Sequence, residues 1–188
     1  PRFWKWRMEG AAFFIYDKVP DPWAYDLVFA TNMISLAHLI ALWGRSAPPI
    51  ALYFHENQFC YPISEGEQRD YHYAMEDIRS ASVADLVLFN SRFHLTEFFN
   101  NAKDFLKRMP DYRFITEIER IQEKSRVLYP GIWFETNVVQ NCTKNKPNRP
   151  VVLWNHRWEY DKGPETFIKG IKTAKNNGLD FSVVLAGE

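Results

Sequence analysis

The sequence has few cysteines, few glycines and no long apolar run. Its 188 residues include two cysteines, Cys60 and Cys142, far apart in the chain. This spacing argues against a disulfide framework and favours a reducing compartment. No apolar stretch approaches the ~20 residues of a membrane-spanning helix. The eight glycines form neither a Walker-type loop nor a G-x-G-x-x-G fingerprint, so the two common phosphate-binding motifs are absent.

An excess of either charge is also missing, since 23 Lys and Arg balance 23 Asp and Glu. A net charge of zero gives no global attraction to nucleic acid or membrane, so such a partner would need a local patch. His55 is followed four positions later by Phe59 instead of a second histidine, and no cysteine pair flanks His72. The spacing therefore predicts no metal site.

Short apolar runs alternate with longer helical patterns, which indicates a doubly wound parallel α/β sheet covered on both faces. We expect strands at Leu27–Ala30, Ile50–Phe54, Leu86–Phe89, Val127–Tyr129, Val151–Trp154 and Ser182–Ala186. We expect helices at Lys5–Tyr16, Ile34–Trp43, Glu67–Ser82, Leu95–Leu106, Ile115–Glu123 and Pro164–Asn176. For the third helix, Ser64 with Glu67 three residues later is typical of a capping box.

Residues 135–149 interrupt this alternation, because they are polar and rich in Asn and Lys. We interpret them as a linker between a domain of residues 1–134 and the start of a second α/β domain at 150–188. The first residues, PRFWKWRM, lack an initiator Met and a signal-peptide pattern, and the last, VVLAGE, form a strand. We therefore expect the chain to be an excerpt of a longer protein.

Polar side chains follow almost every predicted strand. Ligands of an open parallel sheet bind beyond the carboxyl ends of its strands, so these side chains are candidates for a binding cleft. The strongest is the titratable His55, for which the structural alternative is a hydrogen-bonded core histidine. The strand-end groups are Thr31-Asn32-Met33, His55-Glu56-Asn57-Gln58, Asn90-Ser91, Pro130-Gly131 and Asn155-His156-Arg157.

The stretch LWNHRWEYDKGPE, residues 153–165, places two cations just before a helix. Arg157 and Lys162 precede Gly163 and the first helical residue, Pro164. A guanidinium, an ammonium and the backbone N–H groups of a helix N-terminus together suit a diphosphate. The alternative is a loop of solvated charges paired with Glu159 and Asp161.

Several strings give these patterns a more specific interpretation. RFWKWRM (2–8), YFHENQFCYPISEGEQRD (53–70), FNS (89–91), RMPD (108–111) and LWNHRWEYDKGPE (153–165) resemble the tRNA-queuosine α-mannosyltransferases, which are retaining family 4 glycosyltransferases of the GT-B fold. The resemblance is collinear over essentially the whole chain. It implies transfer of mannose from GDP-mannose to the cyclopentenediol of queuosine in the tRNA anticodon, without a metal cofactor. It also implies a cytoplasmic location, with the nucleus left open as a second one, and no membrane partner; no protein partner can be inferred from it.

The resemblance implies roles for individual residues. Arg157 and Lys162 would hold the donor diphosphate and stabilise it as it leaves, with Gly163 and Gly131 beside the donor. His55 would position the transferred sugar and stabilise the transition state from across the cleft. Contacts to sugar or acceptor hydroxyls would come from Glu56, Asn57, Gln58, Asn32, Asn90 and Ser91. The excerpt alone should be inactive, because the first strand and the nucleoside-binding part of the second domain are missing from it.

Contact with tRNA is expected from the basic N-terminal stretch and from Arg108 in a second basic segment, 103–126. Arg2, Lys5 and Arg7 alternate with aromatic rings, which suits phosphate contact combined with base stacking. The alternative, which we favour for the rings, is that Trp4 and Trp6 pack a helix against the sheet.

Two other functions remain open at this point. One is a family 4 glycosyltransferase with another donor or acceptor. The other is a non-catalytic RNA-binding module, in which His55 and Arg157 are dispensable and charge reversal at Arg2, Lys5 and Arg7 abolishes function.

Overall fold

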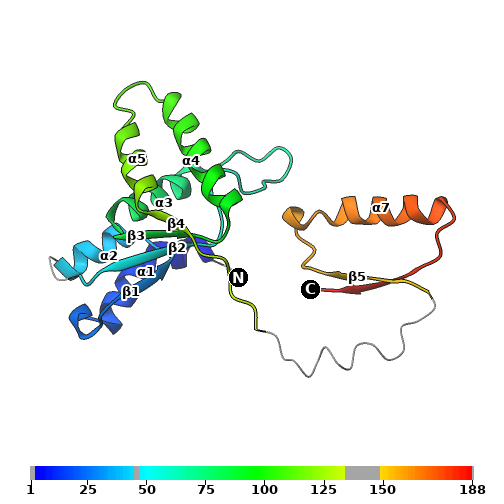
Figure 1. Ribbon diagram of the computed structural model, residues 1–188, viewed down its shortest axis with the longest axis horizontal. Helices are drawn as coiled ribbons and strands as arrows, with labels where there is room; N and C mark the ends of the chain where they lie inside the picture. The colour runs from blue at the N-terminus through cyan, green and yellow to red at the C-terminus, as the bar shows by residue number, and fades with distance from the viewer. Residues whose placement is uncertain (1–2, 45–46, 134–148, 188) are drawn as a thin grey trace. The chain divides into compact units, whose positions relative to one another are not determined.

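The computed structural model describes residues 3–44, 47–133 and 149–187. They belong to two compact units, the first formed by Pro1–Tyr61 with Arg69–Pro130 and the second by Pro62–Gln68 with Gly131–Glu188. The first unit alternates helices and strands (Figure 1): α1 (Trp4–Lys18), β1 (Val28–Thr31), α2 (Leu36–Trp43), β2 (Ile50–Phe54), α3 (Tyr71–Val83), β3 (Leu86–Phe89), α4 (Arg92–Lys107), α5 (Ile115–Glu123) and β4 (Ser125–Val127).

A parallel sheet with the strand order β1-β2-β3-β4 forms the centre of the first unit. Because the order runs in one direction and β-α-β crossovers are right-handed, the connecting helices must lie on the same face. The core agrees, since buried side chains of α1 to α5 form one cluster with Leu52, Phe54, Val87 and Phe89. The predicted α/β class and parallel sheet are therefore confirmed.

The opposite face of the sheet carries only a small buried cluster of Ala51, Tyr53 and Leu88. On that face Phe29 remains 56% exposed. The described residues thus show helices on one face, and the doubly wound part of the prediction is not confirmed. All five residues of β2 are buried, which explains its continuous apolar sequence.

Helix α3 begins four residues later than predicted, at Tyr71. The carboxylate of Asp70 accepts a hydrogen bond from the backbone N–H of His72 and caps the helix. Glu67 does bond the backbone N–H of Ser64, at 3.2 Å, but these residues close a turn instead of opening the helix. The predicted capping-box start was therefore wrong.

Two further boundaries differ from the prediction. Helix α4 begins at Arg92, three residues early, because the Ser91 hydroxyl caps it by accepting from the N–H of His94. Strand β4 is Ser125–Val127 and not 127–129. Its register pairs Val127 with Phe89, the last residue of β3, so the ladder ends before Tyr129.

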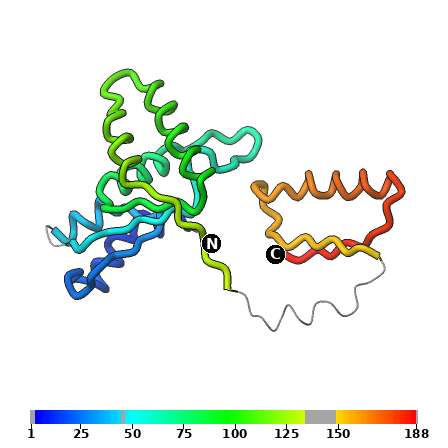
Figure 2. The backbone as a smooth tube through the Cα atoms, in the orientation of Figure 1, coloured from blue at the N-terminus to red at the C-terminus, as the bar shows by residue number. Residues whose placement is uncertain are grey.

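The second unit contains one parallel β-α-β arrangement. Strands β5 (Val151–Asn155) and β6 (Ser182–Ala186) run side by side, and α7 (Pro164–Asn176) connects them (Figures 1 and 2). Their bounds agree with the prediction within one residue. The predicted linker lies outside the described residues except for Arg149, which pairs with Asp180 at 2.8 Å.

Candidate active site

The predicted strand-end groups of the first unit meet at one edge of its sheet. The register pairs Thr31 with Tyr53 and Phe54 with Phe89, so Asn32, His55 and Asn90 each follow a strand end at the same level. The N–H of Asn32 continues the ladder by donating to the carbonyl of Tyr53 at 3.0 Å. The structure thus brings together side chains that are 58 positions apart in the sequence.

The peptide groups of His55 are held from both neighbouring strands. Its N–H donates to Asn32 Oδ1 at 3.1 Å, and its carbonyl accepts from Asn90 Nδ2 at 2.8 Å. The imidazole itself is exposed and lies edge-on to the ring of Tyr53, with centroids 4.9 Å apart. His55 is therefore not a buried core histidine, and its ring is accessible to a ligand.

The residues that follow His55 form a tight polar loop. Gln58 Nε2 donates to Glu56 Oε1 at 2.9 Å and lies 3.6 Å from Met33 Sδ. Met33, just after β1, has a φ of 76°, which is strained for a bulky residue. Asn57 is buried, with its Oδ1 bonded to the N–H of Phe59 and its Nδ2 without a partner. The strain at Met33 was not predicted, because no sequence pattern indicates that a methionine will adopt a left-handed backbone conformation.

Asn90 is oriented by a buried histidine of α4, His94. Because the carbonyl of His55 can only accept, the NH₂ group of Asn90 must face it, and Asn90 Oδ1 faces Nδ1 of His94 at 3.0 Å. Nδ1 of His94 is then the protonated nitrogen. Burial lowers the pKa of His94 to about 4, partly offset by the Glu56 backbone, so the ring is neutral at pH 7.

A second buried group, Asp77 on α3, lies beneath the same loop. Only 4% of this residue is exposed, and its Oδ2 has no hydrogen-bond partner. Burial raises the pKa of Asp77 well above its usual value, and hydrogen bonds from the Asn32 side chain and the Gln58 backbone oppose this rise. The helical periodicity around Asp77 gave no sign that it would face polar groups.

The predicted donor cations of the second unit are paired with acids. Arg157 Nη1 lies 3.0 Å from Glu159 Oε1, and Lys162 Nζ lies 2.7 Å from Asp161 Oδ2. The side chain of Arg157 is 58% exposed and that of Lys162 32%. Both pairs are those expected if the segment were only a loop of solvated charges, yet both cations remain accessible to solvent.

The loop backbone has the expected geometry at the start of α7. Gly163 has a φ of 63°, a left-handed conformation that favours glycine, and no side chain caps the helix. Nearby, the ring of Trp154 packs on Trp158 and Phe167 at centroid distances of 5.9 and 4.5 Å. This aromatic cluster fixes both ends of the loop. Gly131, the other predicted donor residue, is exposed.

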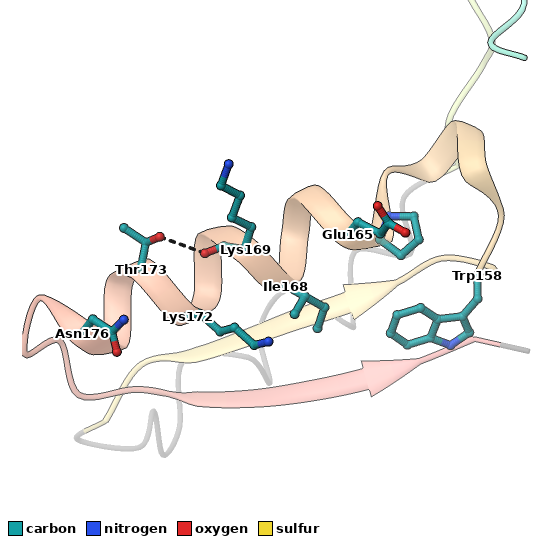
Figure 3. Close-up of a pocket in the computed structure, with 8 residues that line it drawn as sticks. Trp158, Glu165, Ile168, Lys169, Lys172, Thr173 and Asn176 are labelled. Carbon is teal, nitrogen blue, oxygen red and sulfur yellow. Dashed lines mark hydrogen bonds between the residues drawn. The ribbon is translucent and has the colours of Figure 1, made fainter. Parts of the chain in front are cut away.

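A separate open groove of about 640 Å³ runs along α7 (Figure 3). Its apolar part includes Trp158 and Ile168, and Lys169 and Lys172 add positive charge. Arg157, Lys162 and Gly163 do not line it, so the predicted donor residues and this groove are distinct features of the second unit.

Of the predicted RNA contacts, Lys5, Arg7 and Arg108 are exposed, and Arg2 lies outside the described residues. Lys5 Nζ lies 3.7 Å from Asp70 and 5.0 Å from the ring centre of Tyr73. Arg108 lies over the ring of Tyr71 at 5.6 Å. The expectation that both tryptophans are packed is wrong for Trp6, which is 76% exposed. The ring of Trp4 packs against the ring of Tyr73, with centroids 5.1 Å apart.

Metal-binding clusters and membrane-spanning helices are both absent from the described residues. Residues 3–44, 47–133 and 149–187 contain no group of three or more His, Cys, Asp or Glu side chains arranged to hold a metal ion. None of the helices described here is long and apolar enough to cross a membrane.

These features define an α/β protein with titratable and hydrogen-bonding side chains gathered at the carboxyl ends of a parallel sheet. The chain belongs to the family described as "tRNA-queuosine alpha-mannosyltransferase N-terminal", whose family model matches residues 1–132. It is 34% identical to the tRNA-queuosine alpha-mannosyltransferase of Drosophila melanogaster over 197 aligned residues, which cover 98% of this chain. The chain spans about half, 51%, of the length of that relative. The family resemblance is thereby confirmed.

Proposed function

We propose that this chain is part of a glycosyltransferase that moves mannose from GDP-mannose to queuosine in the anticodon of tRNA, with retention of configuration. The single observation that carries the proposal is membership of the tRNA-queuosine alpha-mannosyltransferase N-terminal family over residues 1–132. The name of the Drosophila relative supports the same acceptor and the same sugar.

We assign residues 1–134 to the acceptor-side domain of a GT-B fold, 135–149 to a linker and 150–188 to the start of the donor-binding domain. The division of the chain into two compact units supports this assignment. So does the parallel β5-α7-β6 arrangement, which is the repeating element of a Rossmann-like domain.

In the proposed donor site, Arg157 and Lys162 bind the diphosphate beside the uncapped start of α7, with Gly163 and Gly131 next to it. As GDP departs, negative charge grows on the β-phosphate, and two preorganised cations lower that barrier without a metal ion. Glu159 and Asp161 hold the cations at 3.0 and 2.7 Å before the donor binds. The diphosphate then competes with these carboxylates.

In the proposed sugar site, the imidazole of His55 binds the transferred mannose and stabilises the transition state. Its exposure and the two hydrogen bonds that hold its peptide groups support this role. Glu56, Gln58 and Ser91, which are half-buried, are proposed to contact sugar or acceptor hydroxyls, whereas Asn57 and Asn32 of the predicted acceptor set are buried. We propose that His55 and the pair of Arg157 and Lys162 act on the same donor molecule.

We propose further that Arg2, Lys5, Arg7 and Arg108 contact the tRNA backbone. The exposed ring of Trp6 supports base stacking beside these cations. We expect the protein to work in the cytoplasm, where tRNA is present, and without a membrane partner.

The test uses the full-length protein with GDP-mannose and queuosine-containing tRNA, and reads hexose addition by nucleoside mass spectrometry. We expect a product one hexose heavier than queuosine, and none with tRNA that carries guanosine at the same position. UDP-glucose serves as the control donor. Absence of product from folded protein contradicts the proposal, and product with another donor favours a different family 4 enzyme. RNA binding that survives His55→Ala and Arg157→Ala without any transfer favours a non-catalytic module.

A further inference from the structure

The chain leaves β2 at His55, where the main-chain ladder of the sheet ends. At this point two side-chain amides replace the main-chain hydrogen bonds of the neighbouring strands. Asn32, after β1, accepts a hydrogen bond from the N–H of His55, and Asn90, after β3, donates one to the carbonyl of His55. Asn32 Nδ2 also donates to the carbonyl of Glu56 at 3.2 Å. Asn32 therefore bonds the backbone of two consecutive residues, His55 and Glu56, and Asn90 bonds the backbone of His55.

Asn32 has little capacity left for a substrate. It is only 4% exposed. Because the N–H of His55 can only donate, Asn32 Oδ1 must face it, and the NH₂ group then points to the Glu56 carbonyl and to the carboxylate of Asp77. Asp77 is itself buried, and the backbone of Gln58, like the Asn32 side chain, opposes the rise in the pKa of its carboxyl group. The buried carboxyl group of Asp77, on α3, thus helps to fix the orientation of the Asn32 amide.

Asn90 is supported in the same way from the other side. Its Oδ1 accepts from the Ser91 hydroxyl at 3.2 Å and from Nδ1 of His94 at 3.0 Å. Ser91 and His94 both belong to the start of α4, whose N-terminus Ser91 caps. The orientation of this amide is therefore set by the helix, as that of Asn32 is set by α3.

We propose that Asn32, Asn90 and Asp77 are positioning residues that hold the His55 peptide, so that its imidazole leaves the sheet edge at one fixed position. This inference rests on the proposed role of His55 at the transferred sugar. It also revises the expectation from the sequence that Asn32 and Asn90 contact the acceptor. Displacement of a reacting group by about 1 Å can cost about 100-fold in rate, so loss of either amide lowers kcat.

The first experiment measures mannose transfer by full-length variants. Asn32→Asp and Asn90→Asp keep the size of each side chain but replace the amide donor by an acceptor next to a backbone carbonyl. We expect each to lower kcat by about 10- to 100-fold with KM for GDP-mannose and tRNA changed less than about 3-fold. Asn101→Asp is the matched control, because the Asn101 side chain donates to Glu97 within α4.

A comparison in the His55→Ala background separates positioning from direct contact. If Asn32 and Asn90 act through His55, their variants cause no further loss of kcat when the imidazole is already absent. If they touch the acceptor, the loss persists and appears in KM for tRNA, which overturns the proposal. Asp77→Asn, which keeps an acceptor of the same size, should retain more activity than Asp77→Ala.

A second readout does not depend on activity, so it separates this inference from the proposed function. In full-length protein labelled at histidine, the backbone order parameter of His55 should be about 0.85 in the wild type and below about 0.6 in Asn32→Ala and Asn90→Ala. The variant Asn101→Ala should leave it unchanged. Unchanged order in all variants overturns the inference even if the enzyme transfers mannose. Loosening of His55 in a protein that transfers no mannose sustains the inference about the peptide and contradicts the proposed function.

Discussion

The two candidate sites of this chain are built in opposite ways. At the sheet edge of the first unit, the buried Asn32 holds the backbone of His55 directly and the buried His94 holds it through Asn90, and the imidazole of His55 is exposed. In the second unit, the exposed Arg157 pairs with the exposed Glu159, and the partly exposed Lys162 pairs with Asp161, whose side chain is 11% exposed. Buried hydrogen bonds are insensitive to salt, whereas solvent-exposed ion pairs are screened. The first site is thus suited to fix a sugar, and the second to exchange one anionic partner for another.

The largest expected effect comes from removal of the emerging group itself. His55→Ala should lower kcat for mannose transfer by about 100- to 1000-fold, since removal of one preorganised transition-state contact has effects of this size. The measurement is single-turnover transfer to queuosine-containing tRNA. The control is His72→Ala, because the His72 side chain is exposed and its ring pairs with Asp70. Equal rates for the two variants would remove His55 from the mechanism.

Arg157→Ala should weaken binding of GDP by about 10- to 100-fold, because a charge-assisted hydrogen bond contributes roughly 1.5–3 kcal/mol. Affinity for tRNA should change little. Isothermal titration with GDP, compared with the groove variant Lys169→Ala, checks this prediction. The loss should shrink as salt increases, in contrast to the His55 effect. If Lys169→Ala weakens GDP binding as much as Arg157→Ala, the donor instead occupies the groove along α7.

Acid should destabilise the first unit through His94. The pKa of His94 is lowered to about 4 by burial, below the ~6.5 of an unfolded chain, so the unfolded state binds more protons between these values. The stability that depends on neutral His94 is complete above pH 6.5 and is lost as the pH falls toward 4. We expect a loss of about 2 kcal/mol, less than full conversion of the shift, because the neighbouring Asn90 and Ser91 are only half-buried.

Urea unfolding at pH 7 and pH 5 measures this loss. His94→Asn, which keeps a donor for Asn90, should show a smaller difference between the two pH values. The same pH dependence in wild type and variant would mean that the acid sensitivity comes from other groups.

The smallest effect sharpens the contrast between the sites. Glu159→Gln removes the carboxylate that pairs with Arg157, so a diphosphate no longer competes with it. GDP binding should tighten by about 2- to 5-fold, and the free energy of unfolding should change by less than about 1 kcal/mol, as for other exposed ion pairs. Weaker GDP binding in this variant would show that Glu159 orients Arg157 instead of competing for it.

The same contrast explains what the sequence could predict. Strand ends were identifiable because continuous apolar runs such as Ile50–Phe54 mark buried parallel strands, and the polar residue after each run then lies at one sheet edge. His55 followed directly from this rule. The loop at Arg157 followed from the spacing of two cations before a Pro-started helix.

The residues that were missed all depend on contacts between distant segments. Asp77 and His94 lie on helices whose periodicity identifies a buried face but not the polar groups opposite it. The start of α3 could not be predicted, because Ser64 and Asp70 were both candidate N-caps and serine and aspartate have similar N-cap preferences. The exposure of Trp6 was missed because an aromatic ring in a helix is more often packed than exposed.

The most direct measurement is a structure of the full-length protein with GDP-mannose. The account predicts a ring nitrogen of His55 within about 3 Å of a mannose hydroxyl, and the diphosphate on Arg157 and Lys162 at the start of α7. A donor whose diphosphate lies on other residues, or whose sugar is out of reach of His55, would contradict it.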